Sequence, residues 1–139
     1  MEKGIRTMPP AVTLWGIVFG SFLNKWSKKF EIEPCDVDIA LVDEEMSLEK
    51  FGIDGKIVHT PGHSIGSISV ILSSGEAFVG DMAMNGPPLT LGPNLPIFAE
   101  NNELLLKSWK KLIDLGVKQI FPAHGNDFPI EKLLGKIER

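Results

Sequence analysis

The feature that most constrains the fold of this chain is a short polar motif that follows each of three strand-like apolar runs. The motifs are His59-Thr60-Pro61-Gly62-His63-Ser64, Gly80-Asp81 and Pro122-Ala123-His124-Gly125. In layered α/β proteins, loops that follow strands of one sheet gather at one edge, where functional sites usually lie. We therefore expect His63, Asp81 and His124 to converge on a common rim of one sheet.

The three converging residues are all good metal ligands, because imidazole and carboxylate groups bind zinc, iron and manganese. His63 and Asp81 are 18 residues apart, and Asp81 and His124 are 43 apart, so only the fold could unite them. A carboxylate after an apolar strand is costly unless it is paired or bound to metal, and it can bridge two ions. Each motif alone is more typical of an ordinary turn. Their combination predicts a metal site, whereas His59, inside its strand, is expected to donate a structural hydrogen bond.

The composition indicates one domain and excludes several kinds of partner. The chain has 139 residues and a net charge of -4, which argues against nucleic acid because phosphate binding needs an excess of Lys and Arg. The single Cys35 cannot form an internal disulfide, which suits a cytoplasmic location. The apolar run over residues 11–23 is shorter than the roughly 20 residues that a membrane helix needs. We expect a cytoplasmic protein without a signal peptide or a membrane partner.

Residue periodicity predicts alternating helices and strands along the chain. The expected helices are Val12–Phe30, one from a cap at Asn101 or Asn102 to Leu115, and a last one starting near Asp127 or Pro129. The expected strands are Asp38–Val42, Lys56–Thr60, Ser67–Leu72, Ala77–Val79 and Gln119–Phe121, with a hairpin turn at Ser73–Glu76. The proline- and glycine-rich segment Met82–Pro96 is expected to be a loop that overhangs the site.

These motifs, in this order, resemble those of the metallo-β-lactamase superfamily of hydrolases. Members fold as an αββα sandwich around a site with two zinc ions or sometimes iron. The resemblance implies that His63 binds the first metal, that Asp81 bridges both metals and that His124 binds the second. Zinc is the expected ion, with one or two bound weakly, and iron or manganese would also suit these ligands. The Pro-Gly-His-Ser and Pro-Ala-His-Gly forms look most like the glyoxalase II-like and lactonase-like branches.

The sequence departs from the family at one motif, His-x-His-x-Asp-His, which supplies four further ligands and is absent here. The chain therefore resembles the C-terminal half of a family member. We predict one truncated domain over residues 1–139, of α/β class, with half of the sandwich: a mixed sheet with helices packed on it. We assign no catalytic residue beyond the metal ligands, and expect the isolated chain to be inactive.

The missing half has a consequence for packing, because the inner face of the sheet would have nothing to cover it. The apolar positions concerned are Ile68, Val70, Leu72 and Phe78. A large exposed apolar patch usually marks an interface. The expected partner is a second copy, with the Val12–Phe30 helix exchanged between chains, or a complementary N-terminal half.

Three functions remain open from the sequence. The first is a metal-dependent hydrolase of a small-molecule substrate that needs further ligands from elsewhere. The second is a non-catalytic, dimeric interaction domain derived from the same fold. The third is an α/β domain in which the motifs coincide by chance.

Overall fold

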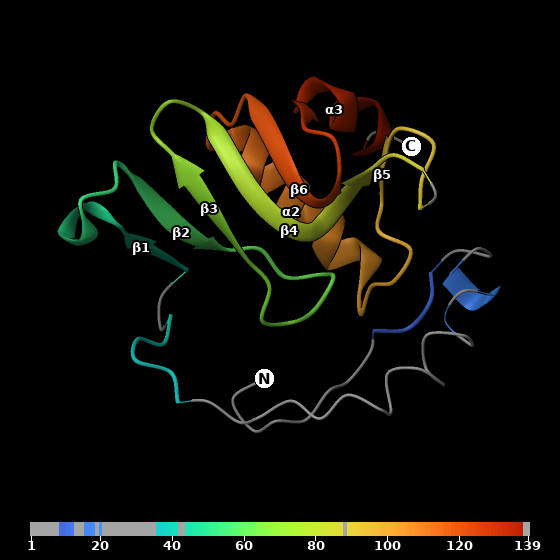
Figure 1. Cartoon of the computed structure of the whole chain (residues 1–139), viewed down its shortest axis with the longest axis horizontal. Coiled ribbons are helices and arrows are strands. Elements are labelled where there is room, and N and C mark those ends of the chain that lie inside the picture. Colours follow the sequence, from blue (N-terminus) through green and yellow to red (C-terminus); the bar gives the residue numbers. More distant parts are fainter. Residues whose placement is uncertain are drawn as a thin grey trace.

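The computed structural model describes residues 9–12, 16–18, 20, 36–41, 44–87 and 89–137. Within these ranges a seven-stranded mixed sheet has the order β1-β2-β3-β4-β6-β7, and β5 pairs with the far end of β4 (Figure 1). Residues 16–18 and 20 are helical, but most of the predicted Val12–Phe30 helix, and Cys35, lie outside the described residues. The strands are β1 (Glu45–Ser47), β2 (Gly55–His59), β3 (Ile68–Leu72), β4 (Glu76–Asn85), β5 (Pro93–Asn94), β6 (Gln119–Gly125) and β7 (Phe128–Pro129). The helices are η1 (Glu49–Phe51, of 3₁₀ type), α2 (Asn102–Asp114) and α3 (Glu131–Ile137).

Strands β2, β3 and β4 form an antiparallel meander, as the alternating apolar pattern predicts. The turn between β3 and β4 is the predicted one, with the Gly75 N–H donating to the Leu72 carbonyl at 3.0 Å. Gly75 has a φ of 109°, which favours glycine at this position. The predicted strands at Lys56–Thr60 and Ser67–Leu72 are therefore confirmed to within one residue.

Strand β4 is longer than the sequence predicts, and this changes the position of Asp81 within the strand. Met82, Ala83 and Met84 are buried parts of the strand, so the predicted Met82–Pro96 loop is wrong over its first four residues, and again at Pro93–Asn94, which form β5. The prolines and glycines that suggested a loop begin only after Asn85. Asp81 consequently lies inside a strand rather than at its end.

Strand β6 runs parallel to β4 and also extends beyond its predicted end at Phe121. Pro122 cannot donate a backbone hydrogen bond, and it pairs with Gly80 where the β4–β6 register shifts. An irregularity of this kind accommodates a proline and turns nearby side chains to a new direction. Pairing resumes at Met84 and His124, which carries β6 on to Gly125.

Helix α2 covers one face of the sheet and lies behind β4 and β6 in Figure 1. It starts as predicted, because the Asn101 side chain accepts a hydrogen bond of 3.0 Å from the Leu104 N–H. Leu105, Trp109 and Leu112 are at most 1% exposed. They form the core with buried side chains of that sheet face and of α3: Val58, Ile71, Ala77, Val79, Ile120 and Leu133.

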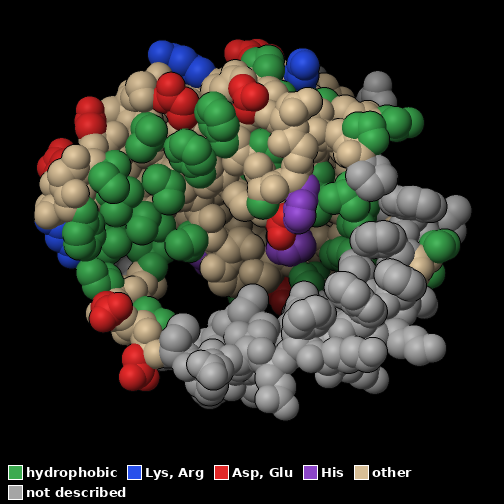
Figure 2. Space-filling model, viewed as in Figure 1, with side chains coloured by type: hydrophobic (Ala, Val, Ile, Leu, Met, Phe, Trp, Pro, Cys, Tyr) green, Lys and Arg blue, Asp and Glu red, His purple; other side chains and the backbone are tan. Residues whose placement is uncertain are grey.

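The opposite face of the sheet is apolar and open. Strand register aligns one row of side chains across five strands: Met46, Ile57, Val70, Phe78 and Phe121. The Phe78 and Phe121 rings stack with centroids 5.1 Å apart. Phe78 is 47% exposed and Ile68 is 46% exposed, while Val70 and Leu72 are partly buried. Figure 2 shows hydrophobic side chains gathered over the strands on the left of this face, so the predicted apolar exposure is confirmed.

Two predicted elements are misplaced. The described residues of the expected Asp38–Val42 strand, 38–41, are not a strand, and Ile39 is 47% exposed. The strand instead forms at Glu45–Ser47, where β1 pairs with β2 and the Lys56 ammonium binds the Glu45 carboxylate at 2.7 Å. The last helix begins at Glu131 rather than near Asp127 or Pro129, because Pro129 belongs to β7 and pairs with β6.

Candidate metal centre

The three predicted ligands converge at one rim of the sheet. Asp81 lies on β4, His124 lies on the neighbouring strand β6, and His63 lies on the loop that follows β2. The Asp81 carboxylate lies between the two imidazoles, with Oδ2 at 3.7 Å from His63 Nε2 and Oδ1 at 3.3 Å from His124 Nε2. In Figure 2, purple histidine side chains lie against a red carboxylate at the centre right. The spatial convergence expected from the sequence is therefore observed.

The orientation of His63 leaves one ring nitrogen free to bind a cation. His63 Nδ1 lies 2.8 Å from the Phe98 carbonyl oxygen. Because a carbonyl can only accept, Nδ1 carries the hydrogen, and in the neutral ring Nε2 presents a lone pair. That lone pair faces a carboxylate oxygen, which is also an acceptor. Two acceptors aimed at each other favour a cation between them, and a backbone carbonyl on the other ring nitrogen is a common support for a metal-binding histidine.

Asp81 has a buried oxygen that no hydrogen bond satisfies. Its Oδ1 atom has no hydrogen-bond partner among the residues that the structure describes, although it is shielded from solvent. An unsatisfied buried carboxylate oxygen is costly, so such an atom needs an explanation, for which an ion is one of the usual ones. Two imidazoles and a carboxylate form a donor set that suits zinc, iron or manganese. The chemistry of these donors thus suits a metal ion, and the orphaned Oδ1 atom is where the carboxylate could contact one.

Close backbone packing fixes His124 beside β4. Gly125 has a φ of 96°, and a Cβ at that position would lie 1.8 Å from the Asn85 carbonyl oxygen. That carbonyl accepts from the Asn126 N–H at 2.9 Å, and the Asn85 side chain donates to the Asn126 carbonyl at 2.9 Å. A glycine after His124 is therefore required by the approach of the two strands.

The loop that carries His63 is held against the start of α2. Gly62 has a φ of 142°, and a Cβ there would lie 2.4 Å from the Leu105 Cα atom. The carbonyls of Gly62 and His63 accept from the N–H groups of Asn101 and Glu100, at 3.0 and 3.1 Å. The same Glu100 side chain accepts from the Ile65 N–H at 2.7 Å. The glycine of the Pro-Gly step is thus required by the contact with the helix.

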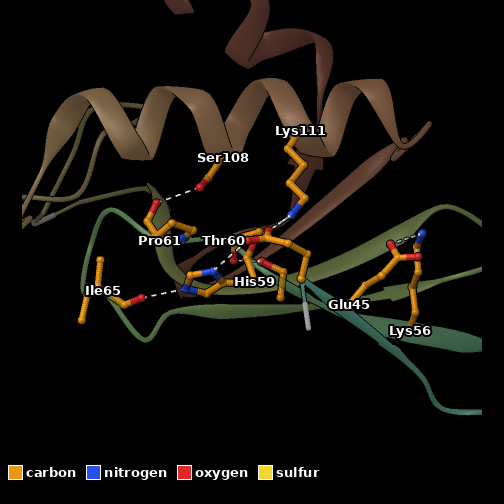
Figure 3. Close-up of polar contacts among 10 residues, drawn as sticks. Glu45, Lys56, His59, Thr60, Pro61, Ile65, Ser108 and Lys111 are labelled. Carbon is orange, nitrogen blue, oxygen red and sulfur yellow. Dashed lines mark hydrogen bonds and ion pairs between the residues drawn. The ribbon is translucent and has the colours of Figure 1, made fainter. Parts of the chain in front are cut away.

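His59 has the structural role that its strand position predicts. Its Nε2 lies 2.7 Å from the Ile65 carbonyl, which can only accept, so the ring donates across the base of the loop (Figure 3). Its Nδ1 lies 3.8 Å from the Glu44 carboxylate, which also binds the Lys111 ammonium at 2.6 Å. The hydrogen bond from Lys111 and its charge hold the pKa of Glu44 below its usual value. His59 therefore ties the ends of the loop together rather than contributing to the centre.

The described residues offer an incomplete coordination sphere. Within the ranges that the structure describes, no group of three or more His, Cys, Asp or Glu side chains is arranged to hold a single ion. Asp81 instead forms one pair with His63 and another pair with His124. Protein zinc sites usually have three or more protein ligands, so each pair falls short of a complete site.

Comparison with known proteins identifies the family. Residues 11–124 match the family described as the metallo-beta-lactamase superfamily. The chain belongs to the metallo-β-lactamase superfamily. A curated relative, the beta-lactamase-like protein 2 homolog of Drosophila melanogaster, is 31% identical over 105 residues, which is 76% of this chain and 32% of that protein.

Solved structures of the superfamily share the fold. The archaeal superfamily protein ST1585 from Sulfolobus tokodaii matches with a TM-score of 0.59 at 20% identity, over 88% of this chain and 48% of that chain. TTHA1623, solved in a di-iron-bound form, matches with a TM-score of 0.52 at 20% identity, over 86% and 58% of the two chains. The chain thus spans about a third of the curated relative and about half of these structures. The mixed sheet with helices on it is a partial αββα sandwich, as the sequence resemblance implied.

Several contributors to the site carry no signal of their own in the sequence. The Phe98 carbonyl orients His63 through its backbone, and backbone groups leave no residue signature. Ser108 and Trp109 contact the ligand-bearing segments, but their helical spacing marks them only as buried positions.

No helix in the described part of the chain is long and apolar enough to cross a membrane.

Proposed function

We propose that this chain is part of a metal-dependent hydrolase of the dinuclear zinc type, in which Asp81 bridges two ions. His63 would bind the first ion and His124 the second. The observation that carries the proposal is the Asp81 carboxylate, which lies between the two imidazoles with a buried oxygen that has no hydrogen-bond partner. Bound metal would polarise the scissile group of a substrate and lower the pKa of water at the site.

The residues of this chain would contribute orientation and charge. The Phe98 carbonyl fixes the His63 ring so that Nε2, and not Nδ1, is presented to the ion. Asp81 supplies the negative charge that offsets part of the charge of two cations. The His124 side chain is 54% exposed, so the second position would be the one that a small-molecule substrate can approach from solvent.

The remaining ligands would come from a segment bearing the family motif His-x-His-x-Asp-His, which this sequence does not contain. Without them, each ion would have two protein ligands, and we propose that zinc is held weakly and that the isolated chain does not turn over substrate. Iron or manganese could replace zinc, because the donor set is compatible with all three.

The test is to strip the protein with a chelator and titrate it with zinc, iron(II) and manganese by calorimetry. We expect weak zinc binding that is lost in His63→Ala and in His124→Ala and only weakened in His59→Ala, the histidine control, which loosens the His63 loop but removes no ligand. Zinc binding that survives both ligand substitutions would refute the ligand assignment. Thioester, lactone and phosphodiester substrates should show no turnover by the chain alone, and turnover that His63→Ala abolishes would refute the proposed inactivity.

A second candidate function, a non-catalytic dimeric interaction domain, is favoured by the open face of the sheet. The row that contains Ile57, Val70 and Phe78 carries no charged side chain, and exposed apolar patches of this kind mark interfaces. The occupant that we propose is a second copy of this chain, because one patch can meet its own copy across a two-fold axis.

Molecular mass in solution tests this second candidate. We expect a dimer by light scattering, dissociated by Phe78→Lys. Leu91→Lys should leave it intact, because Leu91 is 95% exposed and lies between β4 and β5, not on a strand of the row. A tight dimer that binds no metal would favour the interaction domain over the hydrolase. A monomer that binds no apolar dye would exclude the interaction domain.

A further inference from the structure

Two adjacent residues of α2 hold the two segments that carry His63 and Asp81. The Ser108 hydroxyl donates to the Pro61 carbonyl at 2.7 Å (Figure 3). The Trp109 indole N–H donates to the Met82 carbonyl at 2.9 Å. Both side chains are buried, with 3% and 0% exposure. One turn of one helix is therefore hydrogen-bonded to both segments.

The acceptors lie close to the ligands along the chain. Pro61 is two residues before His63, and Met82 directly follows Asp81. Ser108 acts on a loop, whereas Trp109 acts on a central strand. The helix thus sets how far the loop lies from the strand. Across this gap His63 Nε2 and Asp81 Oδ2 face each other at 3.7 Å.

Neither side chain is explained by packing alone. Alanine has a higher helix propensity than serine and would fill a small buried position without a polar atom to satisfy. Serine hydroxyls in helices often turn back to the carbonyl four residues earlier, but this one reaches a loop 47 positions away in the sequence. Phenylalanine would fill much of the indole volume but could not donate to Met82.

We propose that Ser108 and Trp109 are positioning residues that set the spacing between the His63 imidazole and the Asp81 carboxylate. This inference rests on the proposed function, because the spacing matters for a shared metal centre. Groups that support ligands from outside the coordination sphere commonly change metal affinity by about 10–100-fold when they are removed. Ser108 acts as such a group through the Pro61 carbonyl and the loop.

The test uses the full chain and measures metal affinity and loop opening separately. The variants are Ser108→Ala, Ser108→Thr, which restores a hydroxyl, and Trp109→Phe, which removes only the indole donor function. The matched control is Leu112→Val, at a position that is 1% exposed on the same helix and whose side chain has no polar atom to bind a ligand-bearing segment. Cobalt(II) absorption and zinc competition give the affinity. Hydrogen exchange measures how often the loop opens in the absence of metal. The amides to follow are that of Asn101, which donates to the Gly62 carbonyl, and that of Ile65, which lies in the loop.

We expect Ser108→Ala to weaken zinc binding about tenfold and to speed exchange at those amides, and Ser108→Thr to restore both. Trp109→Phe should weaken zinc binding and alter the cobalt spectrum, while Leu112→Val should lower the melting temperature without either change. The inference is overturned if Ser108→Ala and Leu112→Val behave alike in both measurements. If the wild-type chain binds no zinc, the proposed function fails, and hydrogen exchange alone then tests the positioning role. Faster exchange in Ser108→Ala but not in Leu112→Val supports the role of Ser108 in holding the loop. Equal exchange in the two variants refutes it.

Discussion

Replacing Asp81 with asparagine should stabilise the metal-free protein, although it removes the central ligand. When the His63 ring is neutral, the carboxylate of the metal-free chain faces the lone pair of His63 Nε2, and its buried Oδ1 has no hydrogen-bond partner among the described residues. Asparagine is nearly isosteric, carries no charge and has an N–H₂ group. A small rotation would let that group donate to His63 Nε2. The substitution therefore exchanges two opposed acceptors for a donor and an acceptor.

The size of the effect follows from the hydrogen bond that the substitution adds. A hydrogen bond within a folded protein contributes about 0.5–1.5 kcal/mol net, and Asp81→Asn would add one to His63 Nε2. The Asp81 side chain is 34% exposed, so water competes for this donor and the gain does not exceed that range. We expect Asp81→Asn to raise the free energy of unfolding by about 1 kcal/mol, which is a rise of roughly 4 °C in melting temperature for a chain of this size.

Zinc should reverse the order of stability of wild type and Asp81→Asn. A ligand that binds only the folded state stabilises it by about 2.7 kcal/mol at one hundred times its dissociation constant. Wild type should gain this stabilisation and Asp81→Asn should not. The variant should thus be the more stable protein in chelator and the less stable one in saturating zinc.

Thermal unfolding followed by circular dichroism, in chelator and across a zinc series, measures both effects. Asp114→Asn is the control, because that carboxylate is 60% exposed and pairs with Lys110 on the helix surface; its change should stay within about 0.5 kcal/mol. A lower melting temperature for Asp81→Asn in chelator would refute the reasoning about the opposed acceptors. An equal zinc shift in both proteins would refute the bridging role.

Three further predictions follow from the same contacts. Gly62→Ala should cost more than about 1 kcal/mol in chemical unfolding, because the left-handed backbone and the contact with α2 both exclude a Cβ. Gly125→Ala should cost about 1–3 kcal/mol and shift the His124 ring resonances in NMR spectra, because the added Cβ would overlap the Asn85 carbonyl. Lys111→Met should lower the melting temperature at pH 7 and low salt. That difference should shrink as the pH falls below the ordinary glutamate pKa of about 4.3, because Glu44 has a lowered folded-state pKa and its contribution is lost on protonation. Lys111 also donates to the His59 carbonyl at 3.2 Å, so part of the difference can remain at low pH. A difference that persists undiminished at pH 3 would exclude the ion pair with Glu44 as its cause.

The local sequence predicted the meander and α2 well, because both are specified by short-range signals. Alternating side chains define β2 and β3, and the Asn101 cap marks the start of α2. The ends of β4 and β6 could not be predicted in the same way. Their extension depends on the parallel pairing of β4 with β6, two strands that α2 connects, and this non-local contact overrides the local signals of Pro122 and of the proline- and glycine-rich segment after Asn85.

The site was predicted as a set of residues but not as a geometry. The order of the three motifs was enough to predict that His63, Asp81 and His124 meet. The orphaned Oδ1 atom, the carbonyl that fixes His63 and the two donors on α2 depend on atomic positions that no residue spacing encodes. The misplaced first strand has the same origin, since β1 is defined by its pairing with β2 rather than by its own composition.

The parallel pairing of β4 with β6 also bears on the order in which this protein folds. Strands β2, β3 and β4 are joined by short segments, so their pairing closes small loops at a low cost in chain entropy. The contact between Asp81 and His124 spans 43 residues of the chain and closes a larger loop, at a higher cost in chain entropy. We therefore expect β4, which carries Asp81, to form before His124 pairs alongside it. Completion of the ligand cluster would then be one of the late events of folding.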